Sequence, residues 1–376
     1  MISFFYFVYL ILVLSFVWLT FILLFKADFG KKKYSGDFDK PFSVIIPVFN
    51  EPVSDLEESI KSIISSRGVK EVIVVNDGSS INYRDLCFKY GVKYLHNDIN
   101  KGKRFVQAQA VKVAKYDFIV STDSDVIFDK DTCVKLLFPL LDSNIGLTTG
   151  VVKLKNGKGI LFDIQNFQFA MAFEIGRKAL GGNGFLNCGS GALLGFRKKD
   201  YIDLCELYLS DNIDGFKFFP IAFGEDRYLT NLFIKFNFKT VFVEDAICFT
   251  SPVESWKKYY KQQLRWTISG ITQGIYSLSF MFKNNKLLWF YNFLYLVLPF
   301  ISIALFVFSL FNSFSSIFVI VFGSIASTYC KDIYVLLKKP ELWSKGIFFS
   351  LYHFFIIQPL WIIALFRINE KKWMTR

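Results

Sequence analysis

The chain has 376 residues, is 53% hydrophobic and 19% aromatic, and has a mean hydropathy of +0.36, which excludes an ordinary soluble enzyme. Lys and Arg number 44 against 32 Asp and Glu, giving a net charge of +12 that suits an anionic lipid or a phosphorylated substrate. Because the sequence has no arginine-rich arm, zinc-ligand spacing or RNA-binding sheet motif, we expect no nucleic-acid partner.

The N-terminal stretch of residues 3–25 carries no charge, and about 20 such residues are enough to span a bilayer. A signal peptide is the alternative, but the run is too long and lacks both a basic start and a small-residue cleavage site. We therefore predict a transmembrane helix over residues 1–26 and a basic linker over residues 27–40. The positive-inside rule then places the following domain in the cytoplasm.

Residues 41–254 alternate short apolar runs with polar, helical patterns. Strands are predicted at FSVIIPV, EVIVVND, DFIVSTD and TVFVEDA, which favours an α/β domain with a mainly parallel sheet. Ligands of such sheets bind beyond the carboxyl ends of the strands. The six cysteines of the chain form no CxxC pair, which indicates reduced thiols in a cytosolic domain.

The first two predicted strands end in polar residues. Asn50 and Glu51 follow the first strand, and Asp77 follows the second, before a Gly-Ser turn. Turn formation and helix capping explain each motif alone. Their occurrence at the same edge of the sheet favours a nucleotide site.

Lys103 and Arg104 open a predicted helix, where cations oppose the helix dipole. A phosphate shared between them and the helix N-terminus explains this choice, and a solvated basic turn is the alternative. Asp123 and Asp125 follow another strand with one residue between them. Two carboxylates so close repel each other unless a cation lies between them, so we predict Mg²⁺ or Mn²⁺ here in preference to a surface turn.

Two further motifs hold small residues or acids. The loop NCGSGALLGFRK contains Cys188, Ser190 and Gly191, and small residues let a bulky ligand approach the backbone. Glu225 and Asp226 precede a helical segment, where acids are ordinary caps. The alternative is that Asp226 is a general base for an acceptor hydroxyl.

Residues 255–285 predict an amphipathic helix. On a helix that turns by about 100° per residue, one side is apolar along its length. This side is formed by Leu264, Ile268, Ile271, Ile275 and Leu278. We expect this apolar stripe to lie on the bilayer and Gln262, Arg265 and Trp266 to face the soluble domain. The alternative is a membrane anchor, in which Arg265 and Trp266 face the headgroups.

Residues 286–376 contain three further apolar runs, at 286–310, 314–336 and 347–366, which makes about four transmembrane helices in all. Four crossings and an external N-terminus place the basic tail outside, against the charge rule. One segment is therefore expected to be re-entrant or miscounted.

Taken in order, IPVFNE, VNDGS, NKGKR, STDSD, NCGSGALLGFRK, GEDRYLTN and QQLRW resemble the membrane-bound family 2 glycosyltransferases, above all the hyaluronan, chitin and cellulose synthases. The resemblance covers roughly residues 41–280. It implies a GT-A fold (a Rossmann-like domain that binds a nucleotide sugar), a UDP-sugar donor, Mn²⁺ or Mg²⁺, and inverting transfer.

The resemblance also implies roles for the motif residues. Asn50, Glu51 and Asp77 are expected to hold uridine, Lys103 and Arg104 to approach the diphosphate, Asp123 to contact the nucleotide and Asp125 to bind the metal. The loop with Cys188, Ser190 and Gly191 is expected to line the acceptor site, although Ala192 stands where these synthases often have proline. Glu225 and Asp226 are expected to be the acidic residues of the catalytic site, with Asp226 as the general base. Gln262, Arg265 and Trp266 match the Gln-x-x-Arg-Trp signature, which contacts the diphosphate and the acceptor.

The implied protein is an integral membrane enzyme that extends a polysaccharide at the bilayer. A short membrane region departs from the large synthases and leaves open a single transfer to a lipid or polyprenyl-phosphate acceptor. A transporter subunit is disfavoured because the predicted spans hold almost no ionisable residues. A catalytically inactive sugar-binding protein is the remaining alternative.

Overall fold

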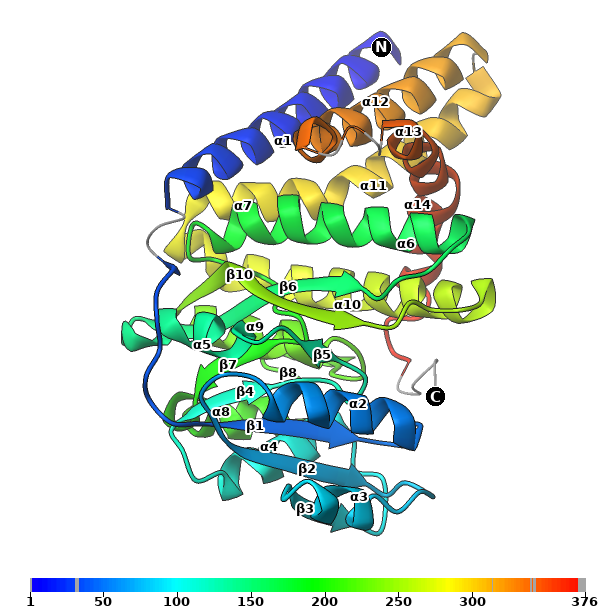
Figure 1. Ribbon diagram of the computed structural model, residues 1–376. Coiled ribbons are helices and arrows are strands. Elements are labelled where there is room, and N and C mark those ends of the chain that lie inside the picture. Colours follow the sequence, from blue (N-terminus) through cyan, green and yellow to red (C-terminus); the bar gives the residue numbers. More distant parts are fainter. Residues whose placement is uncertain (1, 31–33, 313, 339, 341–342, 371–376) are drawn as a thin grey trace.

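The computed structural model describes residues 2–30, 34–312, 314–338, 340 and 343–370. An α/β domain carries a layer of long helices on one side, and the N-terminal helix belongs to this helical part (Figure 1). The main sheet has eight strands in the order β3-β2-β1-β4-β7-β6-β10-β5. Their bounds are Lys93–Asn97, Val69–Asp77, Phe42–Val48, Phe118–Ser121, Leu194–Arg197, Ile145–Leu154, Lys239–Thr250 and Ile127–Phe128. A separate hairpin pairs β8 (Asn212–Ile213) with β9 (Phe216–Pro220).

The sheet is mixed. β1, β2, β3 and β4 pair in parallel, as do β6 and β10, whereas β7 and β5 are antiparallel to their neighbours. The predicted strands are all present, and β1 is buried along its whole length, as expected for an apolar strand covered on both faces. The parallel block β3-β2-β1-β4 brings three polar strand ends, those of β2, β1 and β4, to one edge.

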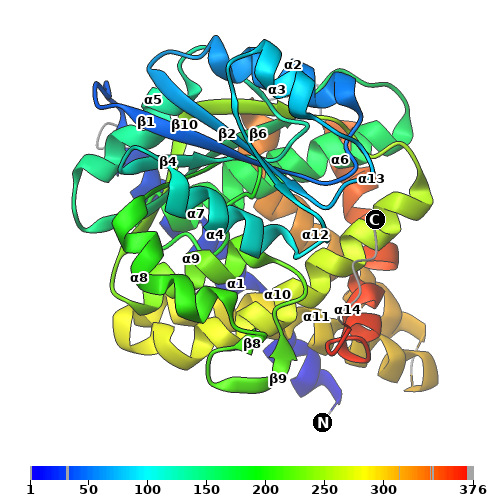
Figure 2. The same ribbon diagram turned by 90° about the horizontal axis from the view of Figure 1, so that it is seen from below.

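Helices cover both faces of the sheet (Figure 2). α2 (Val53–Ile64), α3 (Arg84–Lys89) and α5 (Thr132–Leu137) pack on one face with residues such as Val44 and Val74. α4 (Lys103–Val113), α8 (Lys198–Leu209) and α9 (Glu225–Lys235) pack on the other with Ile45 and Ile73. Alternate residues of one strand therefore enter two separate cores.

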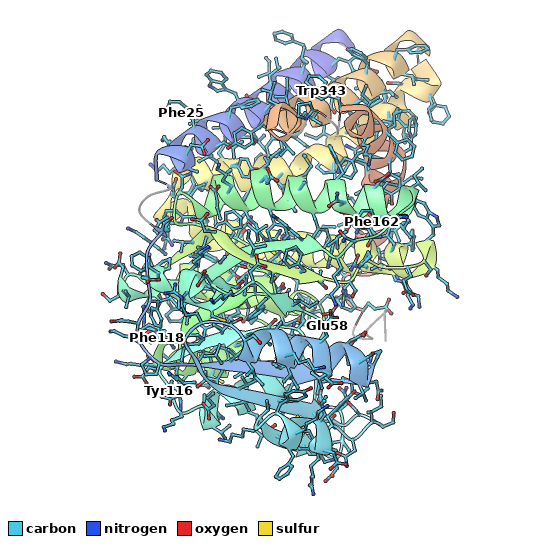
Figure 3. The ribbon with its side chains drawn as sticks, viewed as in Figure 1. Phe25, Glu58, Tyr116, Phe118, Phe162 and Trp343 are labelled. Carbon is cyan, nitrogen blue, oxygen red and sulfur yellow. The ribbon has the colours of Figure 1, made fainter. Side chains whose placement is uncertain are left out.

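The helical layer consists of α1 (Ile2–Gly30), α11 (Lys286–Asn312), α12 (Phe314–Lys338), α13 (Trp343–Tyr352) and α14 (Gln358–Leu365). Two helices connect it to the domain: α6 (Ile160–Met171), which continues through a π-helical turn (Ala172–Arg177) into α7 (Lys178–Gly181), and α10 (Trp256–Asn284). Phe25 and Trp343, which are 64% and 40% exposed, project from this layer (Figure 3).

Three described helical stretches are long and apolar enough to cross a membrane: Phe5–Asp28, Lys286–Phe311 and Lys345–Leu365. The run predicted at 314–336 is helical as α12 but is not one of the three, and it contains Lys331 and Asp332 in its last third. Four crossings therefore stay a prediction. Lys31–Lys33 of the predicted basic linker and residues 371–376 of the tail lie outside the described residues.

The apolar stripe of α10 is covered by protein, which corrects the expectation that it lies on lipid. Leu264, Ile268 and Ile271 are at most 2% exposed and pack with Leu296 of α11 and with Trp361 and Ala364 of α14. Ile275 and Leu278 are only partly buried beside the same cluster. The 3.6-residue period identifies a helix face that avoids water. It does not distinguish between lipid and another apolar helix as the partner of that face, because both are equally apolar.

Candidate active site

Three neighbouring parallel strands, β2, β1 and β4, carry predicted site residues at their carboxyl ends. After β1, Asn50 adopts a left-handed backbone (φ 52°). Its side-chain oxygen accepts hydrogen bonds from the backbone N–H of Ser80 (2.9 Å) and from the Ser80 hydroxyl (3.0 Å). Glu51 Oε2 accepts a bond from Ser124 at 2.9 Å, between the two predicted aspartates. The three motifs are therefore joined into one edge.

Asp77 fixes the loop that leads into α4. The side chain is buried, and its two carboxylate oxygens accept bonds from the backbone N–H groups of Lys101 (2.7 Å) and Gly102 (3.0 Å). Gly78 allows the close approach, since a Cβ there would lie 2.5 Å from the backbone nitrogen of Asn100. As predicted, α4 then begins at Lys103.

Lys103 lies at the centre of an acidic group. Its ammonium is 2.5 Å from Asp123 Oδ1 and 3.4 Å from Glu225 Oε1. A Cβ on Gly191 would lie 2.8 Å from Lys103 Nζ and 3.6 Å from Asp226 Oδ2, so only glycine leaves this space open. The fold thus brings Lys103, Asp123, Gly191, Glu225 and Asp226 together, although they come from four separate segments.

Arg104 is not part of this group. Its Nη1 donates to the backbone carbonyls of Tyr208 (2.7 Å) and Ser210 (2.8 Å), at the C-terminal end of α8. A guanidinium is suited to that end because the last carbonyls of a helix have no intrahelical donor. The two neighbouring cations of the NKGKR motif therefore have different contacts: Lys103 lies among the acidic residues, and Arg104 binds the end of α8.

Asp125 is a carboxylate in a place that disfavours its charge. Burial, together with the charge of Asp123, raises the pKa of Asp125 above its ordinary value, while a bond from the Thr250 hydroxyl (2.8 Å) lowers it. A divalent cation would relieve this charge, so the position fits one oxygen ligand of Mg²⁺ or Mn²⁺. Among the described residues, no group of three or more His, Cys, Asp and Glu side chains is placed to hold a metal ion.

Asp226 is bonded to the glycine-rich loop (residues 187–192). Its Oδ2 accepts a hydrogen bond from the backbone N–H of Gly191 at 3.0 Å. Burial and then the charge of Glu225 raise the pKa of Asp226, while Lys103 and the bonds from Gly191 and Arg227 lower it. The carboxylate is therefore oriented, and its basicity is increased relative to an exposed aspartate.

Threonine hydroxyls and one arginine hold the glycine-rich loop. Thr149 Oγ1 accepts from the N–H of Ser190 and Thr230 Oγ1 accepts from the N–H of Gly189, both at 3.0 Å. Arg177 Nε donates to the carbonyl of Cys188 at 3.1 Å. Sequence reasoning missed these three supports. Of the three, only Thr230 could have been expected from the sequence, because it lies one helical turn after Asp226 in GEDRYLTN.

α10 meets the start of α9 through its polar side. Gly224, the left-handed residue before α9 (φ 72°), approaches so closely that a Cβ there would lie 1.8 Å from Ser269 Oγ. Trp266 lies one turn earlier on α10, is 38% exposed and has its ring 6.2 Å from that of Phe169. Gln262 Oε1 is buried and has no hydrogen-bond partner among the described residues. The Gln262–Trp266 turn thus follows the face of α10 that leads to Asp226.

The neighbouring glutamine has a different task. Gln263 exchanges hydrogen bonds with Gln168 of α6 at 2.7 and 3.1 Å, and the Tyr259 hydroxyl also donates to Gln168 at 2.8 Å. This amide pair, in which Gln263 is buried and Gln168 half-buried, fixes α10 against α6. Of the two glutamines in QQLRW, Gln263 is therefore used for packing, and Gln262 has a buried oxygen without a hydrogen-bond partner in the part of the chain that the structure describes.

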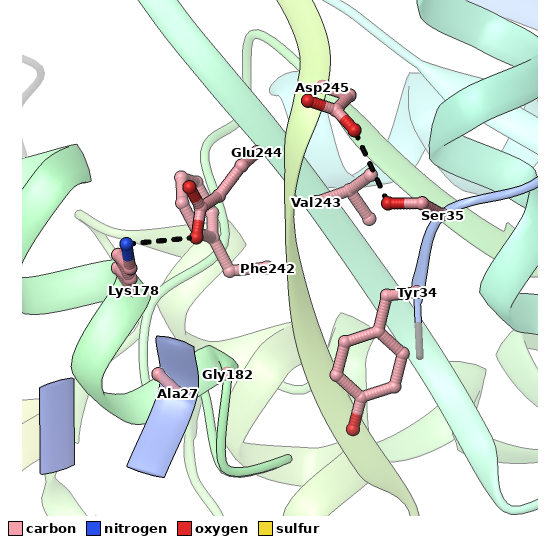
Figure 4. Close-up of a pocket in the computed structure, with 9 residues that line it drawn as sticks. All are labelled: Ala27, Tyr34, Ser35, Lys178, Gly182, Phe242, Val243, Glu244 and Asp245. Atoms are coloured by element: carbon pink, nitrogen blue, oxygen red, sulfur yellow. Dashed lines mark hydrogen bonds and ion pairs between the residues drawn. The ribbon is translucent and has the colours of Figure 1, made fainter. Parts of the chain in front are cut away.

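A pocket elsewhere in the molecule contains none of the predicted site residues (Figure 4). It is lined by Ala27, Tyr34, Ser35, Lys178, Gly182 and residues 242–245. Lys178 Nζ lies 2.5 Å from Asp28, 2.6 Å from the Tyr334 hydroxyl and 3.2 Å from Glu244. Although burial opposes its charge, these partners raise the pKa of Lys178. The pocket therefore borders an ion-pair brace between α1, α7, α12 and β10.

Comparisons with known proteins identify the family of this chain. Residues 43–202 match the model of glycosyl transferase family 2. An N-acetylglucosaminyltransferase of Azorhizobium caulinodans is 30% identical over 89% of this chain and 86% of its own length. The chain belongs to glycosyl transferase family 2.

Other relatives share most of the length. A hyaluronan synthase of Streptococcus pyogenes serotype M1 is 27% identical over 90% of this chain and 84% of the relative. Among solved structures, a mannosyltransferase of Pyrobaculum calidifontis in complex with GDP-Man and Mn²⁺ aligns with a TM-score of 0.60 over 97% of this chain and 99% of its own, at 16% identity. The chain is thus a family 2 glycosyltransferase with a GT-A-like mixed sheet and long apolar helices.

Proposed function

We propose that this protein is an inverting, divalent-metal-dependent glycosyltransferase that moves a sugar from a UDP-sugar to the hydroxyl of a growing polysaccharide. The observation that carries the proposal is the position of Asp226. Its carboxylate is bonded to Gly191 of the glycine-rich loop and lies in one group with Lys103, which contacts Asp123 at the strand edge. A base beside a cation is the arrangement that transfer from a diphosphate requires.

The donor side is proposed at the carboxyl edge of the sheet. Asn50, Glu51 and Asp77 hold the uridine, and Asp123 contacts the nucleotide beside Lys103. The Lys103 ammonium neutralises charge on the leaving diphosphate. Asp125 is the protein ligand of Mn²⁺ or Mg²⁺, which when bound supplies further positive charge to that diphosphate. The contacts of Arg104 with Tyr208 and Ser210 assign it to support of this edge through α8.

The chemical step is a single displacement. Asp226 accepts the proton of the acceptor hydroxyl while that oxygen forms its bond to the anomeric carbon of the sugar. The bond from this carbon to the diphosphate breaks on the opposite face, and its electron pair leaves with UDP. Because attack and departure occur on opposite faces, the anomeric configuration inverts. Glu225 tunes this step through its charge beside Asp226 and its contact with Lys103.

The acceptor side is proposed between the glycine-rich loop and α10. Cys188, Ser190 and Gly191 line it from the loop, and Trp266 lines it from α10. Gln262 and Arg265 reach towards the diphosphate and the acceptor from the same helix. The protein is an integral membrane protein with about four spans and a cytoplasmic catalytic domain, so that the product leaves close to the bilayer.

Single transfer to a lipid or polyprenyl-phosphate acceptor is the alternative function, favoured by the short membrane region. UDP release by purified protein in nanodiscs with Mn²⁺ tests the proposal, using UDP-glucose, UDP-N-acetylglucosamine, UDP-glucuronate and UDP-galactose, with products sized afterwards. A ladder of polymer lengths supports a synthase, and one sugar per lipid supports the alternative. UDP binding without UDP release from any donor would make the protein a sugar-nucleotide-binding relative.

A further inference from the structure

The glycine-rich loop is held by a long side chain from outside the sheet. Arg177 Nε donates to the Cys188 carbonyl at 3.1 Å, and Arg177 Nη2 lies 3.9 Å from Cys188 Sγ. The supports from Thr149 and Thr230 are short side chains of β6 and α9. Arg177 instead comes from the helices α6 and α7, which connect the α/β domain to the helical layer.

The direction of Arg177 follows from a local irregularity of its helix. It is the last residue of the π-helical turn Ala172–Arg177, between α6 and α7. Such a turn holds one residue more than an α-helical turn, so it rotates all later side chains by about 100° relative to an uninterrupted helix. Regular α-helical winding from α6 would therefore place a different residue where Arg177 meets Cys188.

Two neighbours fix the guanidinium and the helix that carries it. The guanidinium of Arg177 lies 4.1 Å from the centroid of the Phe173 ring, and Phe173 is buried and packs on Phe242 of β10. The next residue, Lys178, belongs to the ion-pair brace between α1, α7, α12 and β10. These contacts fix Arg177 independently of its bond to Cys188.

The far end of the loop carries the bond that orients the proposed base. Three residues after Cys188, the N–H of Gly191 donates to Asp226 Oδ2 at 3.0 Å. Three residues of chain span at most about 10 Å. The residue between the two ends is tightly packed, since a Cβ on Gly189 would lie 2.5 Å from Leu194 Cδ2. A displacement of the Cys188 carbonyl is therefore expected to move the Gly191 N–H as well.

We propose that Arg177 is a positioning residue for the glycosyl transfer. By holding the Cys188 carbonyl it sets the place of the Gly191 N–H and, through that bond, the direction of the Asp226 carboxylate. The inference rests on the proposed function, in which Asp226 is the base, and deepens it. Arg177 acts through the loop and not on the donor or the acceptor itself. Because its neighbour Lys178 is anchored in the brace, the orientation of the base depends on how α7 packs against α1 and α12.

Hydrogen exchange and steady-state rates of full-length protein in nanodiscs test this role. In Arg177→Met, the amides of residues 187–192 should exchange faster, while those of residues 98–103 at the strand edge stay unchanged. UDP release from the four UDP-sugars named above should have a kcat about 10–100-fold lower, with little change in the donor KM. Since the Gly191 bond lowers the pKa of Asp226, its loss should move the acidic limb of the kcat/KM profile to higher pH. Arg177→Lys keeps a cation and an N–H donor and should recover part of each effect.

The matched control is Arg197→Met. Arg197 likewise donates to backbone carbonyls, those of Leu140 and Ile145, but it lies at the end of β7 that is remote from the loop. Its replacement should lower stability and leave both the exchange of residues 187–192 and the acidic limb unchanged. Phe173→Leu removes the ring under the Arg177 guanidinium without changing the loop. It should shift the exchange and the acidic limb in the same direction as Arg177→Met, to a smaller extent.

Two results overturn the positioning role. One is unchanged loop exchange in both Arg177→Met and Phe173→Leu, and the other is a lower rate with the acidic limb at the wild-type pH. If Arg177→Met does not fold, Arg177→Lys and Phe173→Leu provide the same test. A wild-type protein that releases no UDP from any of the four donors removes the proposed function instead, and the exchange measurement then still decides whether Arg177 holds the loop.

Discussion

The strand edge and the acceptor side of this protein are built in different ways. At the strand edge, polar groups bond to one another across neighbouring loops: Asn50 to Ser80, Glu51 to Ser124, and Asp77 to the start of α4. On the acceptor side, Gln262 Oε1 is buried with no hydrogen-bond partner among the described residues. The loops of the first region are thus joined to one another by hydrogen bonds, whereas the second holds a buried oxygen without such a bond among the described residues.

Replacement of Asp226 should have the largest effect and should separate the two regions. Asp226→Asn removes the proposed base, so we expect transfer to fall by about 10²–10⁴-fold. UDP affinity should change little, because the strand edge is held by other bonds. Transfer rates and calorimetric UDP titrations check this, with Asp214→Asn, which loses an ion pair to Lys235, as a matched control. Normal transfer in Asp226→Asn would remove the residue from the role of base.

The strand edge was predictable from the sequence because each of its motifs follows an apolar strand directly. Parallel pairing of β2, β1 and β4 then brings Asp77, Asn50 and Asp123 to one edge without further information. The acceptor side required contacts between distant segments. The pattern of α10 predicted that the face with Ile268 avoids water, but it assigned that face to lipid and not to Trp361, some 90 residues later, which covers it.

The proposed metal ligand offers the next largest effect. Asp125→Ala should weaken UDP binding about 10–100-fold in the presence of Mn²⁺ and leave it unchanged in the presence of a chelator. The metal-dependent part of the affinity is the quantity to compare between wild type and variant. Identical affinities with and without Mn²⁺ in the wild type would place metal binding outside this edge altogether.

The two faces of α10 provide an internal comparison. Ile268 is 2% exposed, so Ile268→Ala should lower the unfolding free energy by about 2–4 kcal/mol, with little effect on the turnover of the folded fraction. Trp266 is partly exposed on the other side, so Trp266→Ala should lower turnover roughly tenfold, equivalent to about 1.4 kcal/mol, with little loss of stability. Thermal unfolding and initial rates, measured on the same preparations, check both. Release of Trp266→Ala protein from membranes would restore the anchor interpretation.

The pH dependence of transfer should report the charges around Asp226. A base acts when deprotonated, and burial and Glu225 raise the pKa of Asp226, so the activity should be lost on acidification at a higher pH than an ordinary aspartate gives. Glu225→Gln removes one raising charge and should move this limb to lower pH. Lys103→Met removes a lowering charge and should move it to higher pH. Profiles of kcat/KM check the two signs, and shifts in the same direction would contradict the assignment.

The smallest effect on catalysis is expected on replacing Arg104. Its neighbour Lys103 should have one of the larger effects on donor binding. Arg104→Met removes two bonds to the carbonyls that end α8, which should cost about 1.5–3 kcal/mol of stability. Since its guanidinium faces α8, the KM for the UDP-sugar should change by less than about twofold. Lys103→Met is the matched neighbour and should raise that KM about tenfold, because its ammonium lies beside Asp123 and Glu225. If Arg104→Met raised the donor KM as much as Lys103→Met while stability stayed unchanged, the guanidinium would have to leave α8 and bind the diphosphate when the donor binds. The contacts around the strand edge would then change on ligand binding.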